Sequence, residues 1–363
     1  NIISIISSPA KKLHSSKVEE IEKRINGRYI QVSLSKKPLI RDFQLLKLVL
    51  AIYISQVSRS KIVFQSRFLL FYMIAPFIRW LPRLKLVYEA RGSAITEYCY
   101  NVKQNKGNAK RAWYVRFMEN SVLTNSHLII CVSRKQKDFI VNEYRRVRAG
   151  NIVVIPGLAD SNLFYYSEKL MSTMRNDLGI KDKIIFLYSG RLYRKWQLPD
   201  ILFRTLKCIY DNIPNSFFIM LTPDQDLAKD HFTQQQIPVT SYMITYADMV
   251  QMNPYLNAAD YGILFRENLP INNHASPTKF CEYILSGMKA IISEGVGDFS
   301  QFVLDHHCGQ VVSLSKGIFR IEFDNITQLG PAERERISDL GQNRLSKQSY
   351  LATLKDAFSN LLK

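Results

Sequence analysis

The 363-residue chain contains little of what marks several classes of protein. Its five cysteines are odd in number and scattered, and none are spaced as Cys-x-x-Cys. This pattern argues against a disulfide framework and favours the reduced thiols of a cytoplasmic protein. With only 15 glycines, 13 prolines and a hydrophobic fraction of 47%, we expect buried cores and no extended disorder. The length suffices for two domains of ordinary size.

Long apolar runs are missing as well. The most apolar segment, residues 68–76, is flanked by Arg67 and Arg79 and is much shorter than the roughly 20 residues of a spanning helix. The first residues show no basic stretch before their short apolar run, so no secretory signal is recognised. We therefore expect no transmembrane span, while a peripheral membrane contact stays open.

Acidic residues are scarce in one half of the chain. Residues 1–170 contain 29 Lys and Arg against 11 Asp and Glu, whereas residues 171–363 contain 20 of each kind. The net charge of +18 therefore belongs to the first half. Such a half can face nucleic acid, an anionic membrane or a phosphorylated acceptor, or it can be a solvated basic surface.

Short apolar runs alternate with helical patterns along most of the chain. In the second half, the runs that indicate strands lie at 184–188, 216–221, 240–244, 261–265, 290–292 and 309–312. This alternation predicts an α/β fold of two Rossmann-like, doubly wound domains that face each other across a cleft. We place the domains at residues 1–165 and 166–345, followed by a C-terminal helix within 346–363.

One stretch, residues 268–292, leads from a polar loop into a predicted helix. Ser276 is a suitable N-cap, and Pro277 suits the first helical position, where a missing N–H costs nothing. Gly287 is expected to end this helix about three turns later, before a strand at 290–292. The stretch therefore predicts a helix whose start is surrounded by polar groups.

The start of this helix predicts a nucleotide-sugar site. A helix N-terminus suits phosphate, because its unpaired N–H groups and the positive end of its dipole point the same way. Glu282 follows Thr278 by one turn, where a carboxylate can accept hydrogen bonds from sugar hydroxyls. We expect phosphate at the helix tip and ribose at Glu282.

Four motifs in the second half occur in a familiar order. They are Ile155-Pro156-Gly157 with Asp160 and Phe164, Tyr188-Ser189-Gly190-Arg191 with Lys195, Asn257-Ala258-Ala259-Asp260 before a strand, and SPTKFCEYILSGMKAII at 276–292. Together they resemble the nucleotide-sugar-binding domain of retaining glycosyltransferases of the GT-B fold. The similar family is the large one usually numbered four, in the type that builds bacterial surface polysaccharides. One such motif is weak, but four in order are specific.

The resemblance implies a cationic loop at Gly190, Arg191 and Lys195. Gly190 lets the backbone approach a ligand, and the two cations supply the positive charge that a departing nucleoside diphosphate needs. Arg194 could substitute for either cation. The alternative for each of them is an ordinary surface charge.

The resemblance also assigns roles along the helix. Glu282 corresponds to the glutamate that binds ribose, while Ser276, Pro277 and Thr278 would surround the phosphates. The alternatives are a surface glutamate and a purely capping serine. The family often carries a second glutamate at the position of His274, where it touches the donor sugar. His274 is therefore a donor-binding candidate that can equally be a loop histidine, and Asn273 can share its task.

The first half resembles the acceptor-binding domain less specifically. Arg91 occupies roughly the place of a histidine near the reacting sugar, which makes Arg91, Gly92 and Glu97 candidates for the catalytic cleft. A structural Arg–Glu pair is the alternative. The glycine-rich loop after the family's first strand is missing, so this domain either lacks that strand and loop or belongs to a branch without them. The C-terminal helix is expected to cross back to this domain.

These features lead to one hypothesis with two rivals. We expect a retaining glycosyltransferase that moves a sugar from a nucleotide diphosphate donor to a glycan or lipid-diphosphate-linked acceptor by front-face displacement. No cofactor or metal is expected, since no Asp-x-Asp is assigned to a strand end and Arg191 and Lys195 can stabilise the leaving group. The basic half would contact the inner face of the membrane, and no nucleic acid is expected. The rivals are another GT-B enzyme, such as a nucleotide-sugar epimerase, and a non-catalytic membrane or nucleic-acid binder.

Overall fold

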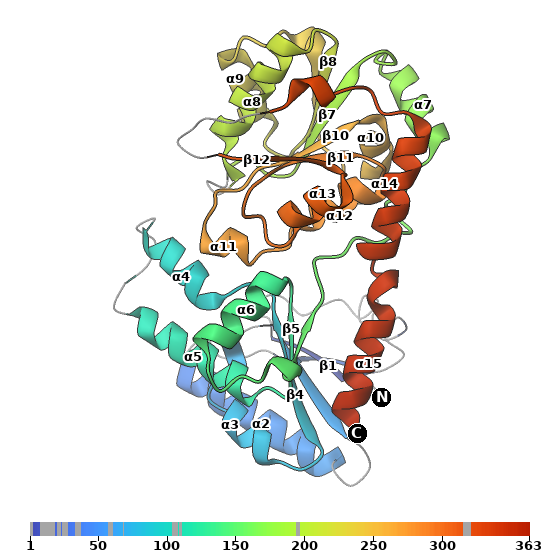
Figure 1. The fold of residues 1–363 in the computed structure, drawn as a ribbon. Helices are drawn as coiled ribbons and strands as arrows, with labels where there is room; N and C mark the ends of the chain where they lie inside the picture. Colours follow the sequence, from blue (N-terminus) through green and yellow to red (C-terminus); the bar gives the residue numbers. More distant parts are fainter. Residues whose placement is uncertain are drawn as a thin grey trace. The chain divides into compact units, whose positions relative to one another are not determined.

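The computed structural model describes residues 3–7, 19, 23, 28–32, 38–56, 61–67, 69–103, 108, 111–193, 197–314 and 321–363 (Figure 1). The chain divides into two compact units. The first comprises Asn1–Glu89, Trp113–Ile129 and Leu362, and the second comprises Ala90–Ala112, Ile130–Leu361 and Lys363. The domain boundaries expected at 165 and 345 stay a prediction.

The first unit contains a parallel strand pair and much of a four-stranded sheet. β1 (Ile3–Ser7) pairs with β2 (Arg28–Val32), and β3 (Ile62–Ser66) runs parallel to β4 (Leu84–Ala90). The sheet continues through β5 (Leu128–Cys131) to β6 (Ile152–Val154), in the order β3-β4-β5-β6. Its helices are α2 (Pro38–Gln56), α3 (Ala75–Trp80) and α5 (Ala112–Asn125). Buried apolar side chains of α2, β3, α3 and β4 form one core.

The sequence pattern predicts that residues 68–81 are helical with an interruption near Pro76, but the α-helix in this segment is short. The described part of this segment holds a 3-10 turn, Leu69–Phe71, and α3 begins only at Ala75. Pro76 lies in the first turn of α3. A proline has no N–H and clashes with the preceding turn, so it tolerates the start of a helix but not its interior.

The second unit is built on a six-stranded parallel sheet. Its strands are β7 (Ile184–Ser189), β8 (Ser216–Leu221), β9 (Tyr242–Thr245), β10 (Tyr261–Leu264), β11 (Lys289–Ser293) and β12 (Gly309–Val312). Their order is β12-β11-β10-β7-β8-β9, and every neighbouring pair is parallel. The chain builds outward from β7 through β8 and β9, then returns to add β10 to β12 on the other side. The order reverses between β7 and β10, where open α/β sheets bind ligands beyond the strand ends.

The second unit also contains most of the described helices. They are α4 (Ala94–Lys103), α6 (Arg134–Glu143), α7 (Glu168–Asp177), α8 (Pro199–Asn212), α9 (Gln225–Gln234), α10 (Met252–Ala258), α11 (Pro270–Asn273), α12 (Thr278–Leu285), α13 (Phe299–His306), α14 (Pro331–Arg344) and α15 (Leu351–Leu362). α12 packs against β10, β11 and α14, as Figure 1 shows. None of the described helices is both long and apolar enough to span a membrane.

The sequence pattern accounts for the parallel α/β class, which is confirmed. The residues of β7 and β8 are buried along their whole length, and both strands are almost entirely apolar. Strands covered on both faces require such continuous apolar runs, whereas a sheet with one wet face would alternate. The predicted strands at 216–221 and 309–312 coincide with β8 and β12. The predicted crossing of the C-terminal helix, α15, to the first domain stays a prediction.

A buried carboxylate joins the amino ends of the central strands to two helices. Asp260, directly before β10, accepts hydrogen bonds from Arg175 Nη2 at 2.8 Å and from Arg334 Nη2 at 2.6 Å. It also accepts the backbone N–H groups of Ile185 at 2.8 Å and Leu329 at 3.0 Å. The side chain of Asp260 is completely buried, and both guanidinium groups are almost so. One carboxylate therefore ties β7 and β10 to α7 and α14.

We expect Asp260→Asn to lower the free energy of unfolding by about 3–5 kcal/mol, because an amide of the same size leaves two buried guanidinium groups without a counter-charge. Urea unfolding followed by fluorescence measures the change. Asp211→Asn is the matched control, since Asp211 pairs with Lys207 on the surface of α8 and should change stability by less than about 1 kcal/mol. Equal effects of the two substitutions would contradict a central role for Asp260.

Candidate functional site

The helix that carries the predicted phosphate site starts later than the sequence indicated. α12 begins at Thr278, Pro277 is the N-cap residue, and no side chain caps the helix. The N-cap assignment of Ser276 is therefore wrong. Instead, its hydroxyl accepts the N–H of Gly157 at 2.8 Å, which joins α12 to the segment that leaves β6. Ser276 is thus engaged by the backbone of its own unit, and the first turn of α12 keeps its N–H groups without a side-chain cap.

Tyr283 fixes α12 on the carboxyl end of β7. Its hydroxyl lies 3.0 Å from both the backbone nitrogen and the hydroxyl of Ser189, the last residue of β7. Its ring packs on Gly262 of β10, where a Cβ atom would overlap the ring. The helix ends as predicted at Gly287, which has φ of +78° and donates its N–H to Ile284 O at 3.1 Å. These contacts position the first turn of α12 beside the loop after β7.

Lys279 brings a cation from α12 to the end of β7. Its ammonium lies 4.9 Å above the ring centre of Tyr188. It also lies against Gly190, whose φ is +122°, and a Cβ atom at Gly190 would overlap Nζ. The pKa of Lys279 is lowered to about 8, mainly by burial and also by Arg266, while Glu282 acts in the opposite direction. A glycine is therefore required at position 190 for two reasons: the Lys279 side chain approaches it closely, and its backbone has a positive φ.

Arg266 supplies a second cation at the same place, because it follows β10 at the switch point. Its backbone N–H donates to Ser293 Oγ at 2.8 Å, while its Nε atom is buried and has no partner in the described residues. Burial lowers the pKa of Arg266, and Tyr188 partly offsets this effect. Neither Lys279 nor Arg266 was among the predicted site residues.

Glu282 is buried on α12, one turn after Thr278. Burial raises its pKa, while the Lys279 ammonium and the Thr278 hydroxyl favour the charged carboxylate. Thr278 itself is exposed at the helix start. The structure therefore brings together Gly190, Thr278 and Glu282, all of which were predicted site residues, around Lys279.

Of the cations predicted in the loop after β7, Arg191 lies on the surface, and the others lie outside the described residues. The side chain of Arg191 is 58% exposed, and its Nη1 atom lies 3.7 Å from Asp224 Oδ1. Its guanidinium also lies 5.5 Å from the ring centre of Tyr193. Lys195 and Arg194 lie outside the described residues. Arg191 is therefore a surface cation that already has a carboxylate beside it.

The expectation of metal-free chemistry overlooked one Asp-x-Asp motif. Asp224-Gln225-Asp226 follows β8, and Asp224 Oδ2 accepts the N–H of Leu192 at 2.7 Å. Asp224 thus organises the loop after β7 and contacts Arg191. Among the described residues, no group of three or more His, Cys, Asp or Glu side chains could hold a metal ion.

The loop before α12 places the predicted sugar contacts in a packed environment. His274 is 8% exposed, its ring centre lies 4.5 Å from that of Phe139, and its carbonyl accepts the hydroxyl of Ser133 at 3.2 Å. Burial lowers its pKa, and Lys135 adds to the effect. His274 Nδ1 and Asn273 Oδ1 are both buried without a partner in the described residues. Asn273 Oδ1 can still accept a hydrogen bond from a ligand, and His274 Nδ1 can accept or donate one according to its protonation.

The predicted acceptor-side residues follow β4. Arg91 and Glu97 are exposed, and Gly92 is half-buried between them and the strand. Glu97 lies in the first turn of α4, where its backbone N–H donates to Ser93 O at 3.1 Å. A carboxylate in this position is favoured by the helix dipole. The capping role expected for Ser133 is confirmed, since its hydroxyl accepts the N–H of Gln136 at 3.0 Å.

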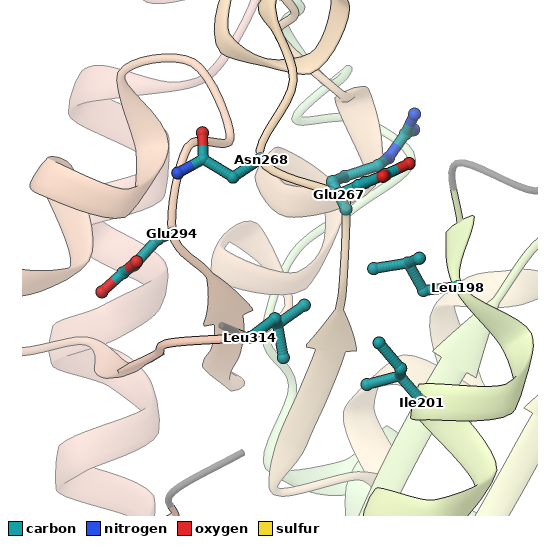
Figure 2. A pocket seen from close by; sticks show the side chains of 7 residues that line it. Leu198, Ile201, Glu267, Asn268, Glu294 and Leu314 are labelled. Carbon is teal, nitrogen blue, oxygen red and sulfur yellow. The ribbon is translucent and has the colours of Figure 1, made fainter. Parts of the chain in front are cut away.

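A hollow of about 310 Å³ lies beyond the carboxyl ends of β10, β11 and β12. It is lined by Leu198, Ile201, Arg266, Glu267, Asn268, Glu294 and Leu314. Figure 2 shows the side chains of Leu198, Ile201 and Leu314 turned toward one another, with the carboxylates of Glu267 and Glu294 on either side. The two carboxylates in this lining make the hollow unfavourable for a strongly negative group.

No protein-family model and no curated protein sequence matches the chain. Solved structures of glycosyltransferases do. A glycosyltransferase from Rickettsia africae ESF-5 superposes with a TM-score of 0.67 at 15% identity, over 95% of this chain and 88% of that one. Anabaena Alr3699/HepE in complex with UDP superposes with a TM-score of 0.66 at 15% identity, over 94% of this chain and 89% of that one. For sucrose-phosphate synthase (tll1590) from Thermosynechococcus elongatus, the TM-score is 0.64 at 16% identity, over 91% of this chain and 83% of that one. The predicted GT-B fold is thereby confirmed.

We expect Tyr283→Phe to destabilise the second unit by about 1–3 kcal/mol, because it leaves the buried N–H of Ser189 without an acceptor while keeping the ring. Urea unfolding measures the effect. Tyr246→Phe is the control, since Tyr246 is exposed and should tolerate the change. If both substitutions leave stability unchanged, the hydroxyl does not fix α12 on β7.

Proposed function

We propose that the protein is a glycosyltransferase that moves a sugar from a nucleotide diphosphate donor to a glycan or lipid-linked acceptor. The observation that carries this proposal is the convergence of the α12 N-terminus, buried Glu282 and the cations Lys279 and Arg266 on the switch point between β7 and β10. The GT-B neighbours add support, because Anabaena HepE has been solved with UDP and with UDP-glucose. We infer the same class of donor for this chain.

We assign a different part of the donor to each group of residues. Glu282 accepts hydrogen bonds from the ribose hydroxyls, and the N–H groups of the first turn of α12, which no side chain caps, bind the phosphates. Ser276 and Pro277 shape this turn, and Thr278 adds a hydroxyl. Asn273 and His274 offer the buried polar atoms closest in sequence to the turn, which suits contacts with the donor sugar.

We further propose retention of the anomeric configuration without a metal ion. In a front-face displacement the bond between the anomeric carbon and the phosphate oxygen breaks, and the acceptor oxygen bonds to the same face. The acceptor proton passes to the leaving phosphate oxygen, so no protein base is required. The protein must then stabilise the charge of the departing diphosphate, and preorganised cations and N–H groups do so. Arg91, Gly92 and Glu97 remain the candidates for contact with the acceptor.

A membrane-linked acceptor suits the surface of the first unit. Phe77 and Trp80 on α3 and Trp113 and Phe117 on α5 are exposed, Trp80 by 85% and Trp113 by 70%. We call these four residues the aromatic surface. α3 and α5 are neighbours, because Arg79 Nη1 donates to Thr124 O at 2.8 Å. Exposed cations, Arg79, Arg83 and Arg116, accompany the aromatic rings. Aromatic and basic side chains together match an anionic bilayer surface.

Donor binding tests the proposal directly. We expect calorimetry to detect binding of at least one of UDP, GDP, ADP and dTDP to the full chain, and Glu282→Gln to weaken it at least tenfold or so, because hydrogen bonds to the carboxylate are lost. Glu335→Gln, on the exposed side of α14, is the matched control and should leave affinity unchanged. If no nucleoside diphosphate binds, the donor site is wrong.

Vesicle binding tests the membrane contact. We expect the protein to sediment with phosphatidylcholine vesicles that contain phosphatidylglycerol, and much less with phosphatidylcholine alone. The double substitution Phe77→Ala and Trp80→Ala should lower partitioning about tenfold or more, since each buried aromatic ring contributes roughly 1.5–3 kcal/mol. Val239→Ala with Val250→Ala, equally exposed in the second unit, is the control. Equal sedimentation of the two double variants would refute this role of the aromatic surface.

A further inference from the structure

Two like charges share a small buried region at the switch point. Lys279 comes from the first turn of α12, and Arg266 follows β10. The positive charge of Lys279 is disfavoured here, because its pKa is lowered first by burial and then by Arg266. Glu282 is the carboxylate that acts on Lys279, so one positive charge is left over in this group. A protein gains nothing in stability from such an arrangement.

The position of Lys279 within its helix is also unfavourable for the isolated fold. A cation in the first turn is repelled by the positive end of the helix dipole, by roughly 0.3–1 kcal/mol. In the described residues, the ammonium contacts the face of Tyr188 and takes part in no hydrogen bond. The Nε atom of Arg266 is buried without a partner there. Groups that are costly for stability and lack partners at a switch point indicate a ligand of opposite charge.

We propose that Lys279, with Arg266 beside it, is the cation that binds the diphosphate of the donor. An anion at this position would neutralise the excess charge, use the three donors of the ammonium and meet the free N–H groups of the same turn. The inference rests on the proposed function and deepens it, because it names the residue that distinguishes a diphosphate from a monophosphate. The sequence analysis predicts that Arg191 and Lys195 bind the diphosphate, and this proposal assigns that role to Lys279 instead.

Arg191 is the less suitable cation on the present geometry. It is largely exposed and lies beside Asp224, so its charge is screened by water and partly neutralised. Lys279 is held by the ring of Tyr188 and by the backbone at Gly190, both of which belong to the rigid end of β7. A preorganised cation loses less conformational freedom on binding than an exposed one does.

Calorimetry on matched variants tests this assignment. The ligands are the best nucleoside diphosphate for the unmodified protein and the corresponding monophosphate. Lys279→Met keeps the aliphatic chain over Tyr188, and we expect it to weaken diphosphate binding by about 10–100-fold, the loss of a charge-assisted hydrogen bond. The monophosphate should lose much less. Arg191→Met removes a charge from the neighbouring loop and should weaken the diphosphate by less than about threefold.

The outcomes separate the two proposals. If the unmodified protein binds no nucleoside diphosphate, the proposed function fails and takes this inference with it. If the unmodified protein binds but Lys279→Met binds equally well, or Arg191→Met loses more, the function stands and the assignment to Lys279 is wrong. Equal losses for monophosphate and diphosphate would also overturn it, because they indicate a general disturbance of α12.

The dependence on pH gives a second test that does not rely on the folding of Lys279→Met. In the unliganded protein Lys279 loses its charge as the pH rises through about 8, so the diphosphate affinity of the unmodified protein should fall. The charged groups that act on Lys279 are Arg266 and Glu282. In Lys279→Arg the affinity should stay flat between about pH 7 and about pH 9, because a guanidinium remains charged. A flat profile for the unmodified protein, or the same fall in Lys279→Arg, would contradict the assignment.

Discussion

The buried carboxylate of Asp260 is the interaction on which the second unit depends. It accepts hydrogen bonds from two guanidinium groups and two backbone N–H groups at once, so both oxygens of this buried carboxylate are fully partnered. Removing one partner of such a group costs far more than the group contributes in net stability. Because Arg334 belongs to α14, and α14 packs against α12, the same carboxylate also supports the helix that carries the candidate site. Stability and site geometry therefore share one electrostatic centre at the amino end of β10.

At the opposite end of the same strands, the charged groups have fewer hydrogen-bond partners among the described residues. At the amino end of β10, one carboxylate serves two arginines that are held rigidly by backbone contacts. At the carboxyl end, Glu282 acts on Lys279, and Arg266 Nε has no partner in the described residues. The contrast is informative because both regions belong to one sheet. Burial alone does not explain the second arrangement, whereas an anionic ligand does.

The fold could be predicted from the sequence because its evidence is local. Continuous apolar runs such as 216–221 have the length and composition of strands buried on both faces, and they became strands at the predicted residues. The site residues on α12 were found in part for the same reason, since a helix start can be recognised from Pro277 and the polar residues before it. The boundary of the helix could not be, because Ser276 is used by Gly157, a residue 119 positions earlier in the chain.

The cations of the site show what local evidence misses. Arg191 matched a motif, yet in the structure it lies beside Asp224, which follows another strand. The spacing of residues in the sequence does not predict that contact. Lys279 lies inside the most informative stretch of the chain and passed as an ordinary helix residue, because its partners, Tyr188 and Gly190, lie about 90 positions earlier. One signal was present in the sequence: a lysine in the first turn of a helix opposes the helix dipole. A residue that destabilises its own helix at the carboxyl edge of a parallel sheet is a better functional candidate than a motif residue whose charge is paired on the surface.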